Sequence, residues 1–196
     1  MRELFLLAVG AVLLLTVLSP LMLLAALAIK LTSRGPVFYR SYRPGTGGKI
    51  FPCLKFRTMV AGAEQLQDRL EEHNEVGGAI FKMRADPRVT AAGRFLRRWS
   101  LDELPQLFNV LRGEMSLVGP RPLPQRDYDR LEDWHRKRYL VMPGMTGLWQ
   151  VSGRSELDFD DLVRLDFLYL ERWSVGLDLA ILLRTIPAVF RAKGAW

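Results

Sequence analysis

The first 30 residues constrain this chain most, because they contain an apolar run long enough to enter a membrane. From Leu4 to Ile29 no side chain is charged, and most of the 26 residues are Leu, Ala or Val. As a helix this run is roughly 39 Å long, whereas the hydrocarbon core of a bilayer is ~30 Å thick. A cleavable secretory signal is the competing interpretation, but the run is too long and its basic region is only Arg2, offset by Glu3. Residues 1–30 are therefore predicted to be membrane-embedded.

A Ser19-Pro20 pair interrupts the apolar run. Proline removes a backbone donor and clashes with the preceding turn, so a bend is expected, with the Thr16 or Ser19 hydroxyl satisfying the carbonyl that is freed near Thr16. The arms on either side are roughly 22 and 14 Å long, so neither crosses a bilayer alone. Two structures compete: a kinked spanning helix, and a helix that turns at the break and returns to the same face. The run by itself favours spanning, which is the commoner arrangement.

Charge indicates which side of the membrane the rest of the chain occupies. Seven basic residues lie between Lys30 and Arg57, and no Asp or Glu occurs from residue 4 to residue 63. Basic flanks stay in the cytoplasm, against anionic headgroups. Residues 31–196 are therefore predicted to form one cytoplasmic domain that lies on its membrane.

Composition narrows the partners of that domain. A net charge of +7 indicates a polyanionic partner, either nucleic acid, an anionic membrane surface or a phosphorylated substrate. The single cysteine, Cys53, excludes an internal disulfide and is best explained as a small buried residue. Two histidines without a cysteine pair argue against a structural zinc site.

The pattern of residues 31–196 predicts an α/β domain that is mostly helical, with short strands and amphipathic helices. Extended segments are expected at 37–40 and 50–59, on either side of a Pro-Gly and Gly-Gly turn. Loops are expected at 77–78 and 113–122, with a Gly-rich connection after Pro143. Helices are expected at 62–74, 88–99, 101–111 (crossed by Pro105), 124–140, 157–170 and 177–190.

An adjacent acidic pair, Asp102-Glu103, is the first candidate for chemistry. Two neighbouring carboxylates repel, so a folded site has to hold them with guanidinium groups or a metal. Residues 82–112 supply seven Lys or Arg and only three acids. A carboxylate kept ionised among arginines suits a phosphate-handling site, as nucleophile or metal ligand. Taken alone, the pair is better explained as the acidic first turn of a helix.

Cationic segments elsewhere extend this hypothesis. Alternation along a strand points Lys55 and Arg57 the same way, although a solvated edge strand has the same pattern. Two prolines flank Arg121 and fix its backbone for bidentate phosphate binding, or simply for a rigid turn. The Gly-rich segment at 143–154 offers backbone N–H groups to an anion, Trp149 as a stacking surface and Arg154 at its end. It lacks the spacing of an ATP-binding P-loop.

Several motifs taken in order carry a resemblance. The Ser-Pro-broken segment is followed by KFRTM, SLDELPQLFNVLRGEMSLVGPRP, PGMTGLWQVSGRS and LDFLYLERWSVGLDLAILLRTIP. Over essentially its whole length the chain resembles the bacterial sugar transferases, the monotopic phosphoglycosyl transferases. The resemblance implies transfer of a sugar 1-phosphate from a UDP-sugar to polyprenyl phosphate, giving UMP and a polyprenyl diphosphate sugar, at the start of exopolysaccharide or O-antigen assembly.

The same resemblance implies roles for individual residues. Asp102 matches the nucleophile that forms a covalent phosphosugar intermediate, and Glu103, beside it, a Mg²⁺ ligand. It also implies location at the cytoplasmic face of the bacterial inner membrane, with a re-entrant helix broken at Ser19-Pro20, which reverses the preference for spanning. The residues expected to bind phosphate are Arg97, Arg121, Lys55, Arg57 and Arg154. Contacts to the nucleotide or sugar are expected from Trp149, Asp158, Asp166 and Asp178, although the acids near residue 160 also suit a solvated helix face.

The expected partners are the UDP-sugar, polyprenyl phosphate and membrane lipids, with a homodimer left open and no nucleic acid. Two other functions compete: a membrane-tethered basic protein that binds nucleic acid or lipid, and a lipid-linked transferase that works by direct attack without a covalent enzyme. The PGMTGLWQVSGRS and KGAW segments resemble longer family members, so the chain is expected to be a minimal enzyme or the catalytic part of a longer one. No motif identifies the sugar.

Overall fold

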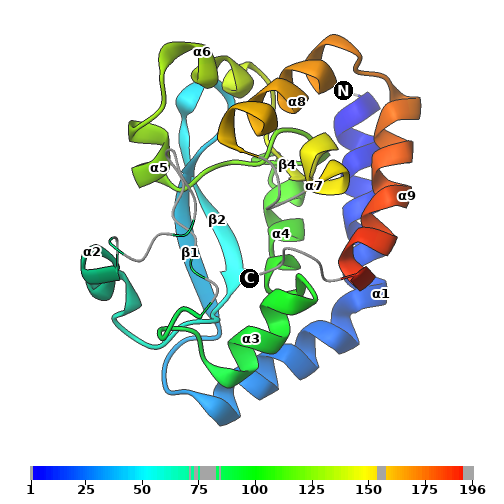
Figure 1. Ribbon diagram of the computed structural model, residues 1–196. Helices are drawn as coiled ribbons and strands as arrows, with labels where there is room; N and C mark the ends of the chain where they lie inside the picture. Colours follow the sequence, from blue (N-terminus) through cyan, green and yellow to red (C-terminus); the bar gives the residue numbers. More distant parts are fainter. Residues whose placement is uncertain are drawn as a thin grey trace.

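The chain begins with one long helix and continues as a mixed, mostly helical domain (Figure 1). A computed structural model describes residues 2–70, 72, 75, 83, 85–153 and 158–191. In that part, only the first helix, α1 (Arg2–Thr32), is long and apolar enough to cross a membrane, with a mean hydropathy of 2.6 in an 18-residue window of its apolar stretch Leu7–Thr32. The predicted α/β, mostly helical class is confirmed.

Helix α1 contains Pro20 and changes direction partway along its length, as Figure 1 shows between its darker and lighter blue parts. Proline provides no N–H for the carbonyl of Thr16, four residues earlier. The Ser19 hydroxyl donates to that carbonyl at 2.9 Å, and the Thr16 hydroxyl donates to the Val12 carbonyl at 2.9 Å. The freed carbonyl is therefore satisfied by the Ser19 hydroxyl, whereas the Thr16 hydroxyl bonds a different carbonyl.

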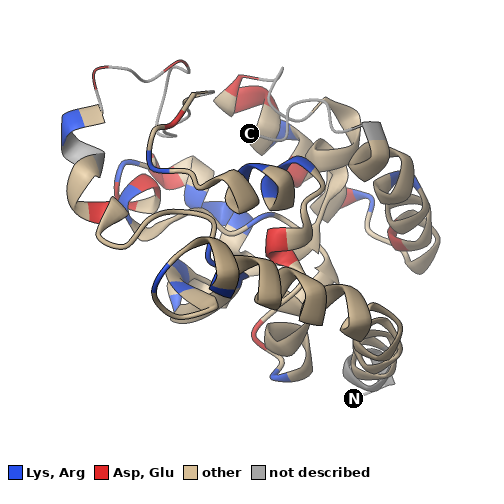
Figure 2. Cartoon of the chain, turned by 90° about the horizontal axis from the view of Figure 1, so that it is seen from below, with Lys and Arg blue, Asp and Glu red and all other residues tan. Residues whose placement is uncertain are grey.

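Each part of α1 packs against the domain along one narrow face. Before the proline, Ala11 lies in a buried cluster with Phe51, Cys53 and Leu107. After the proline, a second buried cluster joins α1 to the strand hairpin and to helix α3 (Ala91–Arg98). Its members are Met22, Ala25, Ile29, Phe56 and Leu96. The remaining faces of α1 leave large apolar side chains exposed, and Figure 2 shows the helix almost free of charge.

The predicted extended segments form an antiparallel hairpin. Strand β1 (Phe38–Pro44) pairs with β2 (Ile50–Phe56) through the short helix η1 (Thr46–Gly48). Gly47, at φ 65°, supplies the left-handed conformation of the turn. The second strand is shorter than predicted, and Met59 instead makes an isolated bridge with Val89.

The segment that follows the hairpin is mostly helical. The described part of the polar segment after β2 forms η2 (Ala63–Leu66) and α2 (Gln67–Leu70). Helix α3 (Ala91–Arg98) falls where a helix was predicted. The predicted helix 101–111 is divided into η4 (Leu101–Glu103) and α4 (Gln106–Leu111), because Pro105 lacks the N–H needed to continue η4 and lies at the N-terminus of α4. The predicted loop at 77–78 lies outside the described residues.

Two very short strands were expected as loops. Strand β3 (Ser116–Val118) pairs in parallel with β4 (Gly144–Thr146). The backbone after β3 lies very close to the backbone before β4: a Cβ on Gly119 would lie 2.7 Å from the Met142 carbonyl oxygen.

The prediction of one helix over 124–140 is wrong. The segment forms α5 (Gln125–Asp129), α6 (Asp133–Arg136) and η5 (Lys137–Leu140). A capping box explains the break: the backbone N–H of Glu132 donates to Nδ1 of His135 at 3.2 Å, which starts a new helix. Helices α7 (Leu148–Ser152), α8 (Phe159–Glu171) and α9 (Val175–Arg191) complete the fold.

Candidate active site

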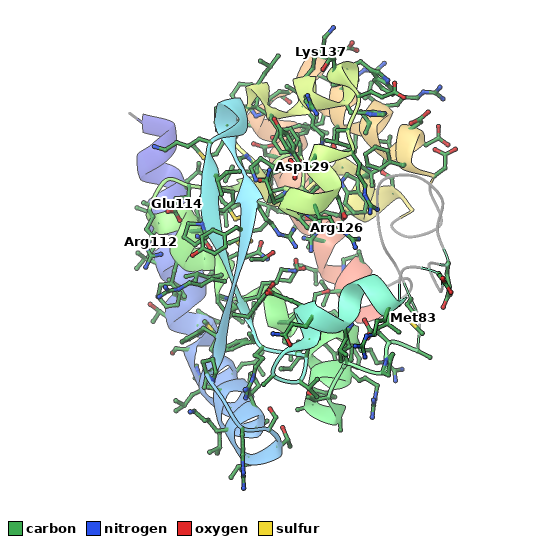
Figure 3. The ribbon with its side chains drawn as sticks, turned by 90° about the vertical axis from the view of Figure 1, so that its left-hand side faces the viewer. Met83, Arg112, Glu114, Arg126, Asp129 and Lys137 are labelled. Carbon is green, nitrogen blue, oxygen red and sulfur yellow. The ribbon has the colours of Figure 1, made fainter. Side chains whose placement is uncertain are left out.

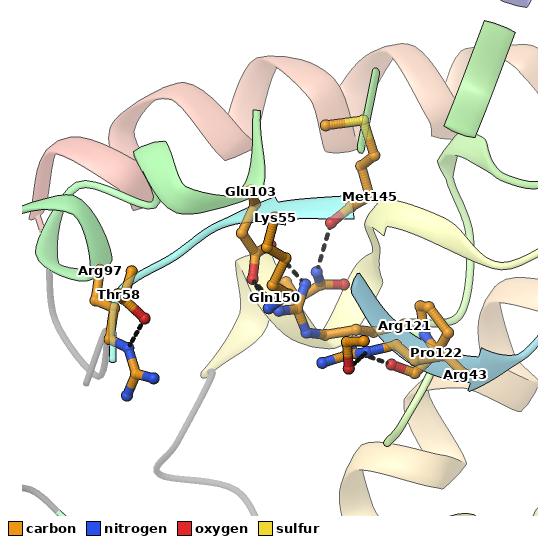
Figure 4. Close-up of polar contacts among 10 residues, drawn as sticks. Arg43, Lys55, Thr58, Arg97, Glu103, Arg121, Pro122, Met145 and Gln150 are labelled. Atoms are coloured by element: carbon orange, nitrogen blue, oxygen red, sulfur yellow. Dashed lines mark hydrogen bonds and ion pairs between the residues drawn. The ribbon is translucent and has the colours of Figure 1, made fainter. Parts of the chain in front are cut away.

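A cavity of about 730 Å³ lies between the hairpin, the α3–η4 segment and the loop after β3. Figure 4 shows several of the side chains that line it. Its charged lining includes four of the five residues predicted to bind phosphate and both members of the acidic pair: Lys55, Arg57, Arg97, Arg121, Asp102 and Glu103. Arg43, which was not predicted, also lines it. Three separate sequence motifs therefore meet at one site.

The acidic pair lies at a strained turn. Helix α3 ends at Arg98, and Ser100 then adopts φ 53°, the left-handed region that non-glycine residues rarely occupy. The turn leads into η4, in which Asp102 is buried. Strained backbone of this kind clusters at functional sites, where the surrounding structure maintains it.

Glu103 is held by two cations. Nη1 of Arg121 donates to Oε2 at 2.7 Å, and Nη2 of the same guanidinium donates to Oε1. The ammonium of Lys55 lies 3.0 Å from Oε1. Although burial favours the neutral acid, Arg121 and Lys55 hold the pKa of Glu103 well below its usual range. Glu103 is therefore a fixed carboxylate.

Asp102 has different surroundings. In the described part of the chain it makes no hydrogen bond or ion pair, although it borders the cavity. Burial raises its pKa, with the neighbouring Glu103 acting in the same direction, while Lys55 and Arg97 oppose the shift. One carboxylate of the pair is thus clamped, and the other remains available to a ligand.

Local structure fixes the cations around the pair. The side chain of Thr90 caps α3 by accepting from the Gly93 N–H at 2.9 Å, and Arg97 in the last turn donates from Nε to Thr58 Oγ1 at 3.0 Å. Burial lowers the pKa of Arg97, while Asp102 acts to raise it.

The strand that carries Lys55 is anchored by one buried amide. Asn109 Oδ1 accepts from the Leu54 N–H at 2.9 Å, and Nδ2 donates to the Pro52 carbonyl at 2.8 Å. Nδ2 also donates to Glu114, which Figure 3 labels at the end of α4. These bonds fix β2, and with it Lys55, against α4.

Arg57 borders the cavity but its hydrogen bonds are made elsewhere. Its terminal nitrogens donate to the carbonyls of Ser33 and Arg34 and to the Ser33 hydroxyl, just after α1. Arg57 thus links the segment after α1 to the hairpin, and its phosphate contact stays a prediction. The alternation argument located the residue correctly but could not detect this competing partner.

The other predicted ligand contacts are divided. Trp149 lines the cavity. Asp158 caps α8 by accepting from the Asp161 N–H at 2.8 Å, and Asp178 accepts hydrogen bonds from Tyr169 and Trp173. Asp166 is buried against Arg138. None of these three acids lines the cavity, and their contact with the nucleotide or sugar stays a prediction. Arg154 lies outside the described residues.

Sequence reasoning missed Arg43. From β1 it donates to the carbonyl of Pro122 and, from Nε, to Ser41 Oγ at 3.2 Å. The only available signal was its place in the basic segment after α1, and a solvated surface arginine gives the same signal. The completed arrangement suits phosphate chemistry, because buried and partly buried cations line one cavity with Asp102, a carboxylate without a hydrogen-bond or ion-pair partner among the described residues.

Comparison with known proteins agrees with this chemistry. A family model described as bacterial sugar transferase matches residues 3–192. The chain is 45% identical over 193 residues to an undecaprenyl-phosphate galactose phosphotransferase of Salmonella typhimurium, covering 96% of this chain and 40% of that protein. It is 45% identical over 197 residues to a UDP-glucose:undecaprenyl-phosphate glucose-1-phosphate transferase of Caulobacter vibrioides, covering 96% and 69%. The exopolysaccharide production protein ExoY of Rhizobium meliloti is 44% identical over 183 residues, covering 91% and 80%.

Proposed function

The chain belongs to the bacterial sugar transferase family, and we propose that it transfers a sugar 1-phosphate from a UDP-sugar to undecaprenyl or another polyprenyl phosphate. The products would be UMP and a polyprenyl diphosphate sugar, the first lipid-linked intermediate of exopolysaccharide, O-antigen or a related glycoconjugate. The names of the relatives support the acceptor and this setting. Because the chain spans only 40% of the Salmonella relative, the activity of that whole protein reaches this chain as a proposal.

The contrast between Asp102 and Glu103 carries the proposed mechanism. An oxygen of Asp102 attacks the β-phosphorus of the donor, the bond from that phosphorus to the bridging oxygen breaks, and UMP leaves with the electron pair. The aspartyl phosphosugar is then attacked at the same phosphorus by an oxygen of polyprenyl phosphate, which releases Asp102 as a carboxylate. A nucleophile that serves both substrates in turn predicts ping-pong kinetics. Arg97, Arg121 and Lys55 lie where they would balance the phosphate charge.

Magnesium is the cofactor that this site would use. Mg²⁺ in proteins is commonly held by one or two carboxylates together with substrate phosphates. No cluster of three metal-ligating acids, histidines or cysteines occurs in the described residues, so the phosphates of the donor would have to complete the site. Glu103 and Asp102 fit this limited donor set, and the ion when bound would supply charge neutralisation for the leaving UMP.

Membrane association is supported by two apolar surfaces. Among its described side chains, helix α1 exposes large apolar residues from Val9 to Leu31. Helix α9 exposes a second apolar stripe at helical spacing, formed by Val175, Leu179, Leu183, Ile186 and Phe190. A stripe of this kind suits a helix lying in the membrane interface. We propose that α1 enters and leaves the inner membrane from the cytoplasmic face, with its bend at Ser19-Pro20.

Release of UMP tests the reaction. Purified protein in nanodiscs would be incubated with undecaprenyl phosphate, Mg²⁺ and a panel of UDP-sugars. We expect one or a few donors to release UMP, with loss of the signal in EDTA and in Asp102→Asn. Asp133→Asn is the matched control, because that side chain is fully exposed at the far end of the domain. Nucleotide release that survives in Asp102→Asn would refute the covalent mechanism.

Exchange without acceptor separates covalent transfer from direct attack. If an aspartyl phosphosugar forms, labelled UMP will enter the UDP-sugar pool when polyprenyl phosphate is omitted. A direct-attack transferase requires both substrates together and would give no exchange, although it would still release UMP in the complete reaction. Absence of activity with every donor, combined with steeply salt-dependent nucleic-acid binding, would favour the basic-tether hypothesis instead.

Cysteine labelling tests the path of α1. In right-side-out and inverted vesicles, Arg2→Cys and Arg34→Cys would be challenged with an impermeant maleimide, in a Cys53→Ser background. A re-entrant helix predicts that both sites react in inverted vesicles only. Reaction of Arg2→Cys in right-side-out vesicles would establish a spanning helix.

A further inference from the structure

The loop that presents Arg121 depends on side chains for its hydrogen bonds. Pro120 and Pro122 have no N–H, so this short stretch offers mainly carbonyl oxygens, and each oxygen has a different donor. The Gly144 N–H donates to the Pro120 carbonyl at 3.0 Å, and Arg43 donates to the Pro122 carbonyl. The middle carbonyl, that of Arg121 itself, accepts from Nη2 of Arg138 at 2.9 Å.

Arg138 is an unusual donor for this purpose. It lies in η5, and its side chain is 0% exposed. The same nitrogen lies 2.5 Å from Oδ2 of Asp166, a residue of α8 that is 1% exposed. The two groups form a buried ion pair by distance, and among the described residues neither Asp166 oxygen accepts a hydrogen bond. Three elements distant in sequence therefore meet at one nitrogen: α8, η5 and the loop after β3.

Stability alone is a poor explanation for this pair. Desolvating two charges costs as much as, or more than, their attraction returns, and apolar residues often replace such pairs without loss of stability. Neither Arg138 nor Asp166 lines the cavity. The feature that distinguishes them is the hydrogen bond from Arg138 to the backbone of the residue that clamps Glu103.

We propose that Asp166 and Arg138 are positioning residues for the transfer reaction. Asp166 orients the Arg138 guanidinium, Arg138 fixes the Arg121 carbonyl, and the loop then presents the Arg121 side chain to Glu103 and to the donor phosphates. The effect on catalysis rests on the proposed function, whereas the effect on the loop does not.

Steady-state kinetics of Asp166→Asn test the catalytic part. Asparagine keeps the volume of aspartate, removes the charge and replaces one carboxylate oxygen with an amide NH₂. We expect kcat to fall about 10- to 100-fold with little change in KM for the donor, since small misplacements of a catalytic group have effects of that size. Val163→Ala is the matched control: Val163 is fully buried on the same helix, so its truncation should lower the melting temperature without lowering kcat. An equal fall of kcat in Val163→Ala would overturn the proposal.

A double-mutant cycle identifies the route of the effect. If Asp166 acts through Arg121, then Asp166→Asn should change kcat less than about twofold in an Arg121→Lys background, because coupled residues are not additive. If the double variant instead loses kcat by the product of the two single-variant losses, the two residues act independently, and the proposed route is overturned.

Hydrogen exchange tests the positioning without any turnover. Amides in a peptide covering residues 117–123 should exchange faster in Asp166→Asn than in wild type, and at the wild-type rate in Val163→Ala. Unchanged exchange in Asp166→Asn would overturn the proposal. If wild type releases no UMP from any donor, the proposed function fails, and this measurement still decides whether the pair holds the loop.

Discussion

Arg121 holds Glu103 with both terminal nitrogens of its guanidinium, Nη1 lying 2.7 Å from Oε2. The neighbouring Asp102 lies at the same cavity and makes no such contact with any described residue. Adjacent residues of one short helix thus differ sharply in electrostatic environment. This difference separates a fixed carboxylate from an available one and is the basis for assigning them different roles.

Arg121→Lys should impair transfer while leaving the fold intact. Lysine retains the charge but cannot form the two-point contact with a carboxylate. We expect kcat/KM for the donor to fall roughly 100-fold, as when one preorganised donor is removed from an active site. UMP release measures the loss. Arg136→Lys is the control, because its side chain is half-exposed and outside the cavity; a loss below threefold in Arg121→Lys would contradict the assigned role.

Asp102→Asn should remove activity and, at neutral pH, increase stability. Burial raises the pKa of Asp102, so the folded state binds its proton more tightly than the unfolded chain does. The stability that the protonated Asp102 carboxyl contributes is fully present below the pKa that this group has in the unfolded chain. It is lost as the pH rises through the higher pKa of Asp102 in the folded protein. Asparagine imitates the protonated form and avoids this loss. The variant should lose transfer by on the order of 10⁴-fold or more.

Thermal unfolding between pH 4 and pH 8 measures the stability part of this prediction. The melting temperatures of Asp102→Asn and wild type should nearly coincide at the acidic end and diverge as pH rises, with the variant higher. Asp133→Asn should show no comparable divergence, because its side chain is fully exposed. A wild type that is more stable than Asp102→Asn at pH 8 would show that the site stabilises the ionised carboxylate.

The parts of the site that could be predicted from sequence are those encoded by short, continuous segments. The acidic pair, the Pro-Arg-Pro turn and Lys55 each lie within one motif, and the structure brings them to one cavity. Arg57 shows the limit of this reasoning. The extended segment and the direction of its side chain were predictable. The carbonyls of Ser33 and Arg34, which accept hydrogen bonds from its guanidinium, come from a separate segment of the chain.

The features that could not be predicted depend on pairing between distant residues. Ser116 pairs with Gly144 in a parallel strand pair too short to leave an alternating pattern. Asp166 looked like a polar contact on a helix, because nothing local distinguishes an acid that faces solvent from one buried against Arg138. The Tyr169 partner of Asp178 likewise depends on how α8 packs against α9. Asp158 differs, because it caps α8 through the Asp161 N–H, a contact between residues close in sequence.

Gly93→Ala should disturb the position of Arg97. A Cβ at this residue would lie 2.0 Å from the Thr58 carbonyl oxygen, so α3 would have to move away from the segment after β2. Arg97 would then lose its 3.0 Å bond to Thr58 Oγ1. We expect a loss of about 1–3 kcal/mol in unfolding free energy, as for other overpacked sites, together with reduced transfer. Gly176→Ala is the control, since its Cβ would meet nothing closer than 3.9 Å; equal effects of the two changes would contradict the argument.

Ser100→Gly should relieve the strained turn that leads to the acidic pair. A left-handed conformation costs a non-glycine residue roughly 1–2 kcal/mol, and the added freedom of glycine in the unfolded chain takes back about 0.5–1 kcal/mol. The net expectation is a small increase in melting temperature with transfer largely retained. Ser152→Gly, in α7, should do the opposite, because a helical glycine only destabilises.

Ser100→Val should lower both stability and kcat, since a β-branched residue resists this conformation and the turn would rearrange next to Asp102. Unchanged stability and kcat in Ser100→Val would show that the turn does not constrain the carboxylate pair.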